Sequence, residues 1–133
     1  MMERKEKYSI SEIASMFDIT SRTIRYYEQV GLLKSEEREG PTHQRYFTDS
    51  ERRRLKLILR GKRQGFKLEE IKEMIDLYES NPTGEKERQR ILQYADEKIA
   101  EITEKIHELE MMRAEIEMHR QRFLEEKDNE QKG

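Results

Sequence analysis

The sequence predicts a mainly α protein, with a winged helix-turn-helix head followed by a long C-terminal helix that pairs with a partner chain. Three observations lead to this class. Arginines and tyrosines lie in a short segment, residues 20–33, that follows another short helical segment and a tight turn. A Gly-Pro step separates two short stretches that can pair as a wing. A seven-residue apolar series runs from Ala95 to Phe123.

The composition is that of a helical protein with much of its surface in water. Of the 133 residues 42% are charged and 33% hydrophobic, which is too polar for one globule with a deep core. Periodic apolar spacing favours helices over disorder along most of the chain. No apolar run is long enough to span a membrane, and the first residues lack the apolar core of a signal peptide. We therefore expect a cytoplasmic protein without a membrane partner.

Charge is distributed unevenly between the two halves. Residues 1–66 hold 15 Lys and Arg against 10 Asp and Glu, a net charge of +5. Residues 67–133 hold 12 against 19, a net charge of −7. A basic first half suits a polyanion, whereas the acidic second half is repelled by one or simply solvates an exposed helix. The balance favours nucleic acid as the partner of the head.

Two short helices open the head. Ser11 is the expected N-cap of the first, which covers Glu12 to Met16. Asp18-Ile19 forms the turn, and Thr20 or Ser21 caps the second helix. We expect these helices to bury their apolar positions, which are Ile13, Ala14, Phe17, Ile24, Tyr27 and Val30. The opposite side of the second helix carries Arg22, Arg25, Tyr26 and Gln29.

Three boundaries follow in the head. Gly31 is expected to end the second helix, and Gly40-Pro41 turns a short β-hairpin. Thr48 and Glu51 match a capping box that opens a third helix, which ends at Gly65. Apolar residues of the third and fourth helices form amphipathic faces: Leu55, Leu57, Ile58, Leu59, Leu68, Ile71, Met74, Ile75 and Tyr78. The expected domains are a head over 1–78, a hinge over 79–84, a dimerisation helix over 85–124 and a disordered tail over 125–133.

Heptad spacing in residues 85–124 predicts a coiled coil. The series Ala95, Ile102, Leu109, Ile116 and Phe123 is unbroken. The second apolar position of each heptad, three residues earlier, is occupied by arginine near the end of the helix, at Arg113 and Arg120. Such a helix is about 60 Å long and cannot bury its apolar stripe alone. We therefore expect a homodimer. The predicted seam consists of Leu92, Ala95, Ile99, Ile102, Ile106, Leu109, Ile116 and Phe123.

The order of these elements resembles the MerR family of transcriptional regulators. The stretches YSISEIASMFDITSRTIRYYEQVGLL and HQRYFTDSERRRLKLILRGKRQGFKLEEIKEMI carry the resemblance, over roughly residues 8–78. It implies an antiparallel dimerisation helix and a dimer bound to a pseudo-palindrome in promoter DNA. Family members bend and untwist that operator so that RNA polymerase can engage both promoter elements. RRLKLILRGKRQGFKLEEIKEMIDLY further resembles the subgroup that controls leucine, isovalerate and acyl-CoA catabolism genes.

The resemblance assigns DNA contacts to three elements. Those in the recognition helix are Arg22, Arg25, Tyr26 and Tyr27; those in the wing are Arg45 and Tyr46; those at the end of the third helix are Lys62 and Arg63. Arginine forks suit guanine edges and phosphates. Core packing is the stronger interpretation for Tyr27, which shares the apolar side of its helix, and DNA contact the stronger one for Tyr26.

Other functions find little support in the sequence. The chain has no cysteine, so disulfides and thiolate metal sites are excluded, and its three histidines lack ligand spacing. No catalytic constellation or phosphate loop occurs, so we expect a non-enzyme without a cofactor or metal. Sensors of metals and redox state in the family use cysteines, so any effector here should be a small organic molecule. Two alternatives remain: a simple repressor that does not distort DNA, and a coiled-coil adaptor or architectural DNA-binding protein.

Overall fold

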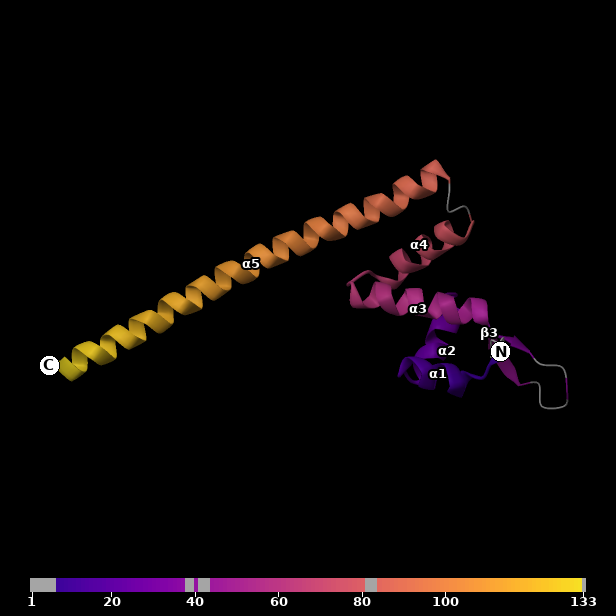
Figure 1. Cartoon of the computed structure of the whole chain (residues 1–133), viewed down its shortest axis with the longest axis horizontal. Coiled ribbons are helices and arrows are strands. Elements are labelled where there is room, and N and C mark those ends of the chain that lie inside the picture. The colour runs from indigo at the N-terminus through magenta and orange to yellow at the C-terminus, as the bar shows by residue number, and fades with distance from the viewer. Residues whose placement is uncertain (1–6, 38–39, 41–43, 81–83, 133) are drawn as a thin grey trace, which may run out of the picture. The chain divides into compact units, whose positions relative to one another are not determined.

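The computed structural model describes residues 7–37, 40, 44–80 and 84–132, which form helices and three short strands (Figure 1). The chain separates into two compact units, residues 1–88 and 89–133. The elements in chain order are β1 (Lys7–Tyr8), α1 (Ile10–Phe17), α2 (Ser21–Gln29), β2 (Glu36–Glu37), β3 (Arg45–Thr48), α3 (Asp49–Arg63), α4 (Leu68–Ser80) and α5 (Glu85–Lys132). The mainly α class, with a helix-turn-helix, a wing and a long C-terminal helix, is confirmed.

The core of the first unit is built from the apolar faces predicted for its helices. Within this unit α1 packs on α2, and α3 packs on α4 (Figure 1). Ile13, Ile24, Leu55 and Ile58 are fully buried, and Phe47 of β3 joins them. Val30 departs from its predicted inward position: it is 38% exposed, because it caps α2 after the last regular turn.

The first helix begins two residues earlier than the sequence analysis expected. Ser9, and not Ser11, is the N-cap: its Oγ accepts the Glu12 N–H at 3.1 Å, and the Glu12 carboxylate accepts the Ser9 N–H at 3.2 Å. This reciprocal pair requires the hydroxyl three residues before the carboxylate, a spacing that Ser9 meets and Ser11 does not.

Three helices end in the same backbone motif. After α2, the Leu32 N–H donates to the Tyr27 carbonyl at 2.8 Å while Gly31 adopts a φ of 83°. Gly65 plays the same part after α3 with a φ of 86°, which confirms both predicted glycine stops. After α1 the residue in the left-handed conformation is Asp18, with a φ of 55°. Aspartate tolerates this conformation better than most residues, so the turn between α1 and α2 stays tight.

The wing forms as predicted, and a further strand joins it. β2 and β3 are antiparallel, with Glu36 opposite Tyr46 and Glu37 opposite Arg45. β1 pairs with the other edge of β3, placing Tyr8 opposite Phe47. β1 was not predicted from the sequence, because a two-residue strand has no periodicity to detect. Pro41 of the predicted turn and His43 lie outside the described residues.

The third helix uses only half of its predicted capping box. The Thr48 hydroxyl accepts the Glu51 N–H at 3.3 Å. The Glu51 carboxylate, however, accepts the backbone N–H of Lys34 at 2.9 Å and so ties the chain after α2 to α3. In a complete capping box this carboxylate would accept the Thr48 N–H. Its actual donor, Lys34, is distant in the sequence, so a local motif cannot predict the contact.

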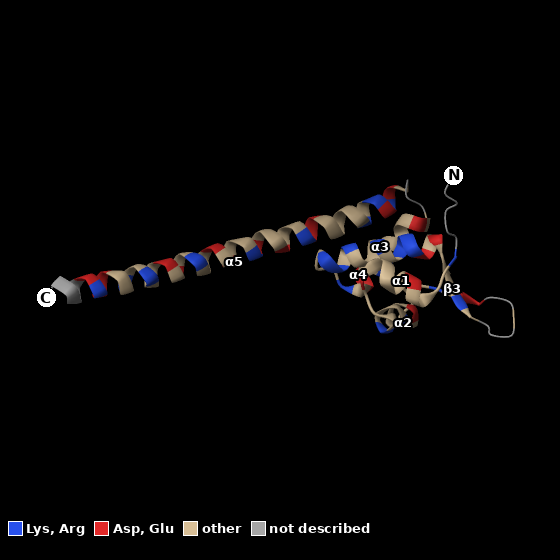
Figure 2. Ribbon diagram, turned by 60° about the horizontal axis from the view of Figure 1, so that its bottom comes forward, with Lys and Arg blue, Asp and Glu red and all other residues tan. Residues whose placement is uncertain are grey.

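The last helix is longer than predicted. α5 is continuous from Glu85 to Lys132, whereas the sequence analysis placed a disordered tail over 125–133. Blue and red segments alternate along its ribbon, as Figure 2 shows, and ion pairs such as Lys98–Glu101 at 2.8 Å form on its surface. Such pairs stabilise the surface of the helix. Within the described residues, no helix has the length and apolar character needed to cross a membrane.

Candidate nucleic-acid interface

The outward face of α2 presents two arginines and a tyrosine to solvent. Thr20 caps the helix by accepting the Thr23 N–H at 3.1 Å. Arg22, Arg25 and Tyr26 follow at helical spacing and are all exposed, Tyr26 by 49%. Among the described residues, neither arginine makes an ion pair or side-chain hydrogen bond. Their guanidinium donors are therefore available to a ligand outside the chain.

Tyr27 lies on the opposite side of the same helix. Its side chain is only 6% exposed and belongs to the core cluster with Ile24. Burial raises the pKa of the Tyr27 phenol above its usual value, and the neighbouring Tyr26 adds to the rise. The two rings lie 6.2 Å apart at 46°. This placement favours the packing interpretation of Tyr27 over direct contact with DNA.

The wing residues are held by contacts inside the head. The Arg45 guanidinium pairs with the Glu28 carboxylate of α2 at 2.9 Å, yet 64% of its side chain remains exposed. The Tyr46 hydroxyl donates to Glu36 at 2.9 Å, and the Lys7 ammonium lies 4.8 Å from the centre of the Tyr46 ring. The Arg45–Glu28 pair connects the wing directly to α2. Arg45 of β3 thus links two of the three elements to which DNA contacts were assigned.

Basic residues also gather in the last turn of α3. Arg60, Lys62 and Arg63 lie there, and all three are exposed. Cations at a helix C-terminus are favoured by the helix dipole, so part of their role is local. Their exposure leaves the ammonium and guanidinium groups able to meet an anion as well.

Comparison with known proteins assigns the chain to a family. Residues 8–77 match the family described as "MerR HTH family regulatory protein", and residues 52–119 match "MerR, DNA binding". The first match alone spans the helix-turn-helix, the wing and the α3–α4 pair. The chain belongs to the MerR family. It is a DNA-binding transcriptional regulator of the MerR type.

Curated relatives align along most of this MerR-family chain. The regulator ZntR of Escherichia coli (strain K12) is 34% identical over 113 residues, which cover 83% of this chain and 76% of ZntR. CueR of Vibrio cholerae is 37% identical over 114 residues, which cover 82% and 76%. HmrR of Rhizobium leguminosarum is 31% identical over 109 residues, which cover 82% and 81%. The similarity therefore extends beyond the head.

Solved structures share the fold. PbrR691 from Ralstonia metallidurans CH34, solved in complex with lead(II), has a TM-score of 0.66 and 26% identity, covering 82% of this chain and 81% of its own. HiNmlR, a family member that lacks the sensor domain and was solved bound to promoter DNA, has a TM-score of 0.58. Its identity is 23%, and the alignment covers 84% of this chain and 85% of HiNmlR. At that identity the likeness is one of fold.

Arg54 is a connecting residue that the sequence analysis did not single out. Its side chain is only 11% exposed and donates three hydrogen bonds. Nε donates to the Leu32 carbonyl at 2.6 Å, and the two terminal nitrogens donate to Asp76 at 2.8 Å and Glu79 at 2.6 Å. Arg54 stands within the run RRR, where nothing local separates it from Arg53, whose side chain is 61% exposed. Only the packing of α3 against α4 does so.

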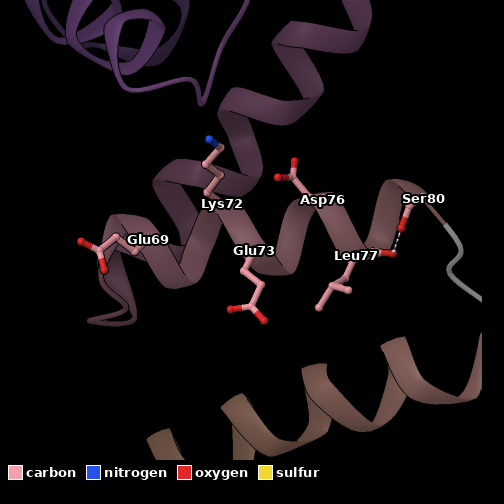
Figure 3. Close-up of a pocket in the computed structure, with 6 residues that line it drawn as sticks. All are labelled: Glu69, Lys72, Glu73, Asp76, Leu77 and Ser80. Carbon is pink, nitrogen blue, oxygen red and sulfur yellow. Dashed lines mark hydrogen bonds between the residues drawn. The ribbon is translucent and has the colours of Figure 1, made fainter.

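The outer surface of α4 carries a shallow pocket (Figure 3). All six of its lining residues belong to this one helix: Glu69, Lys72, Glu73, Asp76, Leu77 and Ser80. Within the described part of the chain, no group of three or more His, Cys, Asp or Glu side chains is arranged to hold a metal ion.

Proposed function

We propose that this MerR-family regulator recognises a specific promoter sequence through the outward face of α2. One observation carries the proposal: Arg22, Arg25 and Tyr26 share an exposed helix face, and among the described residues the two arginines have no partner inside the protein. Arg22 and Arg25 read base edges in the major groove, where an arginine fork matches the two acceptors of guanine. Tyr26 contacts the backbone beside them.

We also propose phosphate contacts on either side of the recognition helix. Arg45 and Tyr46 provide them from the wing, and Lys62 and Arg63 from the end of α3. Arg45 supports this assignment because it stays exposed while Glu28 fixes its position. Contacts of this kind set the register of the protein on DNA but do not read sequence.

Substitutions separate the two kinds of contact. Arg22→Ala or Arg25→Ala should weaken operator binding by about 1–3 kcal/mol and relax specificity at one base. Lys62→Ala should weaken binding to all sequences evenly and flatten the dependence of affinity on salt. Arg122→Ala, in α5, is the matched control and should change neither. Selection of genomic fragments provides the operator, and fluorescence anisotropy across a salt series gives the affinities. Equal binding to operator and random duplex would favour the architectural alternative.

The proposed active species is a homodimer held by α5. Apolar side chains spaced by heptads stay exposed in the single chain: Leu92, Ile99, Ile102, Ile106, Leu109, Ile116 and Phe123. With Ala95 they form the proposed antiparallel seam over residues 85–124. We propose residues 1–78 as the DNA-binding domain and 79–84 as the hinge, of which 81–83 lie outside the described residues. Two heads then meet successive major grooves about 34 Å apart, or a multiple of that spacing.

We further propose that the dimer distorts its operator and so controls access of RNA polymerase. Wing contacts reach flanking phosphates only when the duplex curves toward the protein, and that bending costs on the order of 1–6 kcal/mol. Circular-permutation mobility and chemical probing of the central base pairs should reveal a kink or untwisting. Straight, unreactive operator DNA under all conditions would instead leave a simple repressor as the better account.

The proposed effector is a small organic molecule, and we propose no cofactor or metal. The absence of cysteine removes the thiolate ligands that soft metals require. The resemblance of residues 53–78 to regulators of leucine, isovalerate and acyl-CoA catabolism makes an acyl-CoA the first compound to test. A sub-micromolar effect of a metal ion on operator affinity would contradict this. Promoter DNA also places the proposed site of action in the cytoplasm.

A further inference from the structure

The segment Gly31–Lys34 forms a joint between the recognition helix and the wing. It begins at the glycine that ends α2 and leads to β2. Leu32 and Leu33 of this joint are buried in the core, with exposures of 1% and 4%. The angle between α2 and the wing depends on where this joint lies.

Arg54 fixes the joint on one side. Its Nε donates to the Leu32 carbonyl at 2.6 Å, and its other two nitrogens are held by Asp76 and Glu79 of α4. The guanidinium is planar, so carboxylates on two of its nitrogens determine the direction of the third donor. Asp76 and Glu79 thereby control how Arg54 holds the backbone at Leu32.

A second hydrogen bond holds the same joint, and a lysine of α4 lies beside it. The Glu51 carboxylate of α3 accepts the Lys34 N–H at 2.9 Å. The Lys72 ammonium of α4 lies beside Gly31, 3.1 Å from where a Cβ at that position would sit. Figure 3 shows Lys72 and Asp76 pointing to one side of α4, with Glu73 and Leu77 on the other. The side that carries Lys72 and Asp76 is the one tied to the joint.

We propose that Arg54 is a positioning residue for DNA recognition: it locks the joint between α2 and the wing to α4, and Asp76 and Glu79 hold it in that orientation. The proposal deepens the proposed function and rests on it. Arg54 acts through the backbone at Leu32 and touches no DNA. A change in the position of α4 is therefore transmitted through Arg54 to the angle between the recognition helix and the wing.

The opposing interpretation is that Arg54 is a phosphate contact whose acidic partners merely compete with DNA. The two interpretations predict opposite effects of removing those partners. If Arg54 positions the joint, Asp76→Ala with Glu79→Ala leaves it unoriented and weakens operator binding. If Arg54 contacts phosphate, the same change frees it and strengthens binding. Glu69→Ala is the matched control, because it removes a carboxylate of α4 while the two that pair with Arg54, Asp76 and Glu79, remain.

The experiment measures operator affinity by anisotropy across a salt series for five proteins: wild type, Arg54→Met, Arg54→Lys, the Asp76→Ala/Glu79→Ala double variant and Glu69→Ala. Arg54→Lys keeps the charge but cannot donate to three acceptors in one plane. For both Arg54 variants and the double variant, we expect the dissociation constant for the operator to rise about tenfold or more. A misplaced bidentate base contact has an effect of this size. Their salt slopes should equal that of wild type, because no phosphate contact is lost.

Hydrogen exchange at the amides of residues 32–34 provides a readout independent of DNA. Exchange should accelerate in the Arg54 variants while circular dichroism shows an intact fold. If Arg54→Met does not fold, Arg54→Lys and the double variant carry the test. A flatter salt slope, tighter binding by the double variant, or wild-type affinity of Arg54→Lys would overturn the proposal. If the wild type does not discriminate operator from random duplex, the proposed function is rejected instead. The amide exchange tests the role of Arg54 independently of DNA binding.

Discussion

At the scale of single residues, Glu51 carries a carboxylate in an unfavourable place. Burial raises its pKa above the usual value near 4.5, although the Lys34 N–H and the charge of Arg54 act in the opposite direction. A carboxyl group with a raised pKa binds more protons in the folded than in the unfolded state between the two pKa values. The stability that this group contributes therefore falls as pH rises through the window above 4.5.

Replacing Glu51 with glutamine should remove this pH dependence. The amide oxygen of Glu51→Gln can still accept the Lys34 N–H, and no charge has to be buried. We expect the variant and the wild type to have similar free energies of unfolding at acid pH. As pH rises above 4.5, the free energy of unfolding of the variant should exceed that of the wild type. Urea unfolding at a series of pH values measures the difference. Glu51→Ala is the control: it loses the acceptor and should be less stable than Glu51→Gln at every pH.

At the scale of elements, Gly61 sets the approach of α3 to α4. A Cβ at Gly61 would lie 2.8 Å and 2.9 Å from Cγ1 and Cδ1 of Ile71, a side chain only 2% exposed. Helix propensity alone favours alanine over glycine by about 1 kcal/mol. The overpacking cost of about 1–3 kcal/mol exceeds that gain where the neighbour cannot move. Glycine therefore suits this position in the last turn of α3 because it lacks a side chain.

Gly61→Ala should accordingly destabilise the protein by roughly 1 kcal/mol or slightly more. Combining it with Ile71→Val removes the Cδ1 atom and should cost less than the sum of the two single changes, as coupled neighbours do. Arg60→Ala, an exposed change on the same helix, should stay within about 0.5 kcal/mol of wild type. Thermal and urea unfolding give all four values. A stabilised Gly61→Ala variant would show that α4 can move away without loss.

At the scale of the whole molecule, the apolar stripe of α5 governs the proposed dimer. Burying one leucine contributes about 1.5–3 kcal/mol, and Leu109→Glu loses it in both chains. We expect the dissociation constant of the dimer to rise by roughly a hundredfold or more. Sedimentation velocity measures it, and operator binding should fall in parallel.

Met111→Glu is the matched control for this change. It introduces the same charge two residues away, off the heptad seam. The two side chains are similarly exposed in the single chain, Met111 by 61% and Leu109 by 58%, so the variants differ in their position relative to the seam. The control should remain dimeric, because a carboxylate there stays in water. A wild-type protein that sediments as a monomer at micromolar concentration would contradict the dimer itself.

The sequence by itself determined the order of the helices and the glycine ends of α2 and α3. Helical spacing identified the buried faces of α1 and α2, and the two glycines at positive φ ended α2 and α3 where expected. These features depend on residues three or four apart, so a local pattern contains them. The exposed arginines of α2 were predictable for the same reason, since they lie opposite Ile24 and Tyr27.

Only the tertiary structure decided which polar groups connect the elements. Glu51 turned from its own helix to the Lys34 amide, a partner that is distant in the sequence. β1 exists because β3 has a free edge beside it. Arg54 became the joint's anchor because α4 brings Asp76 and Glu79 to it across more than 20 residues of chain. Such contacts depend on the packing of distant segments, which no local periodicity encodes.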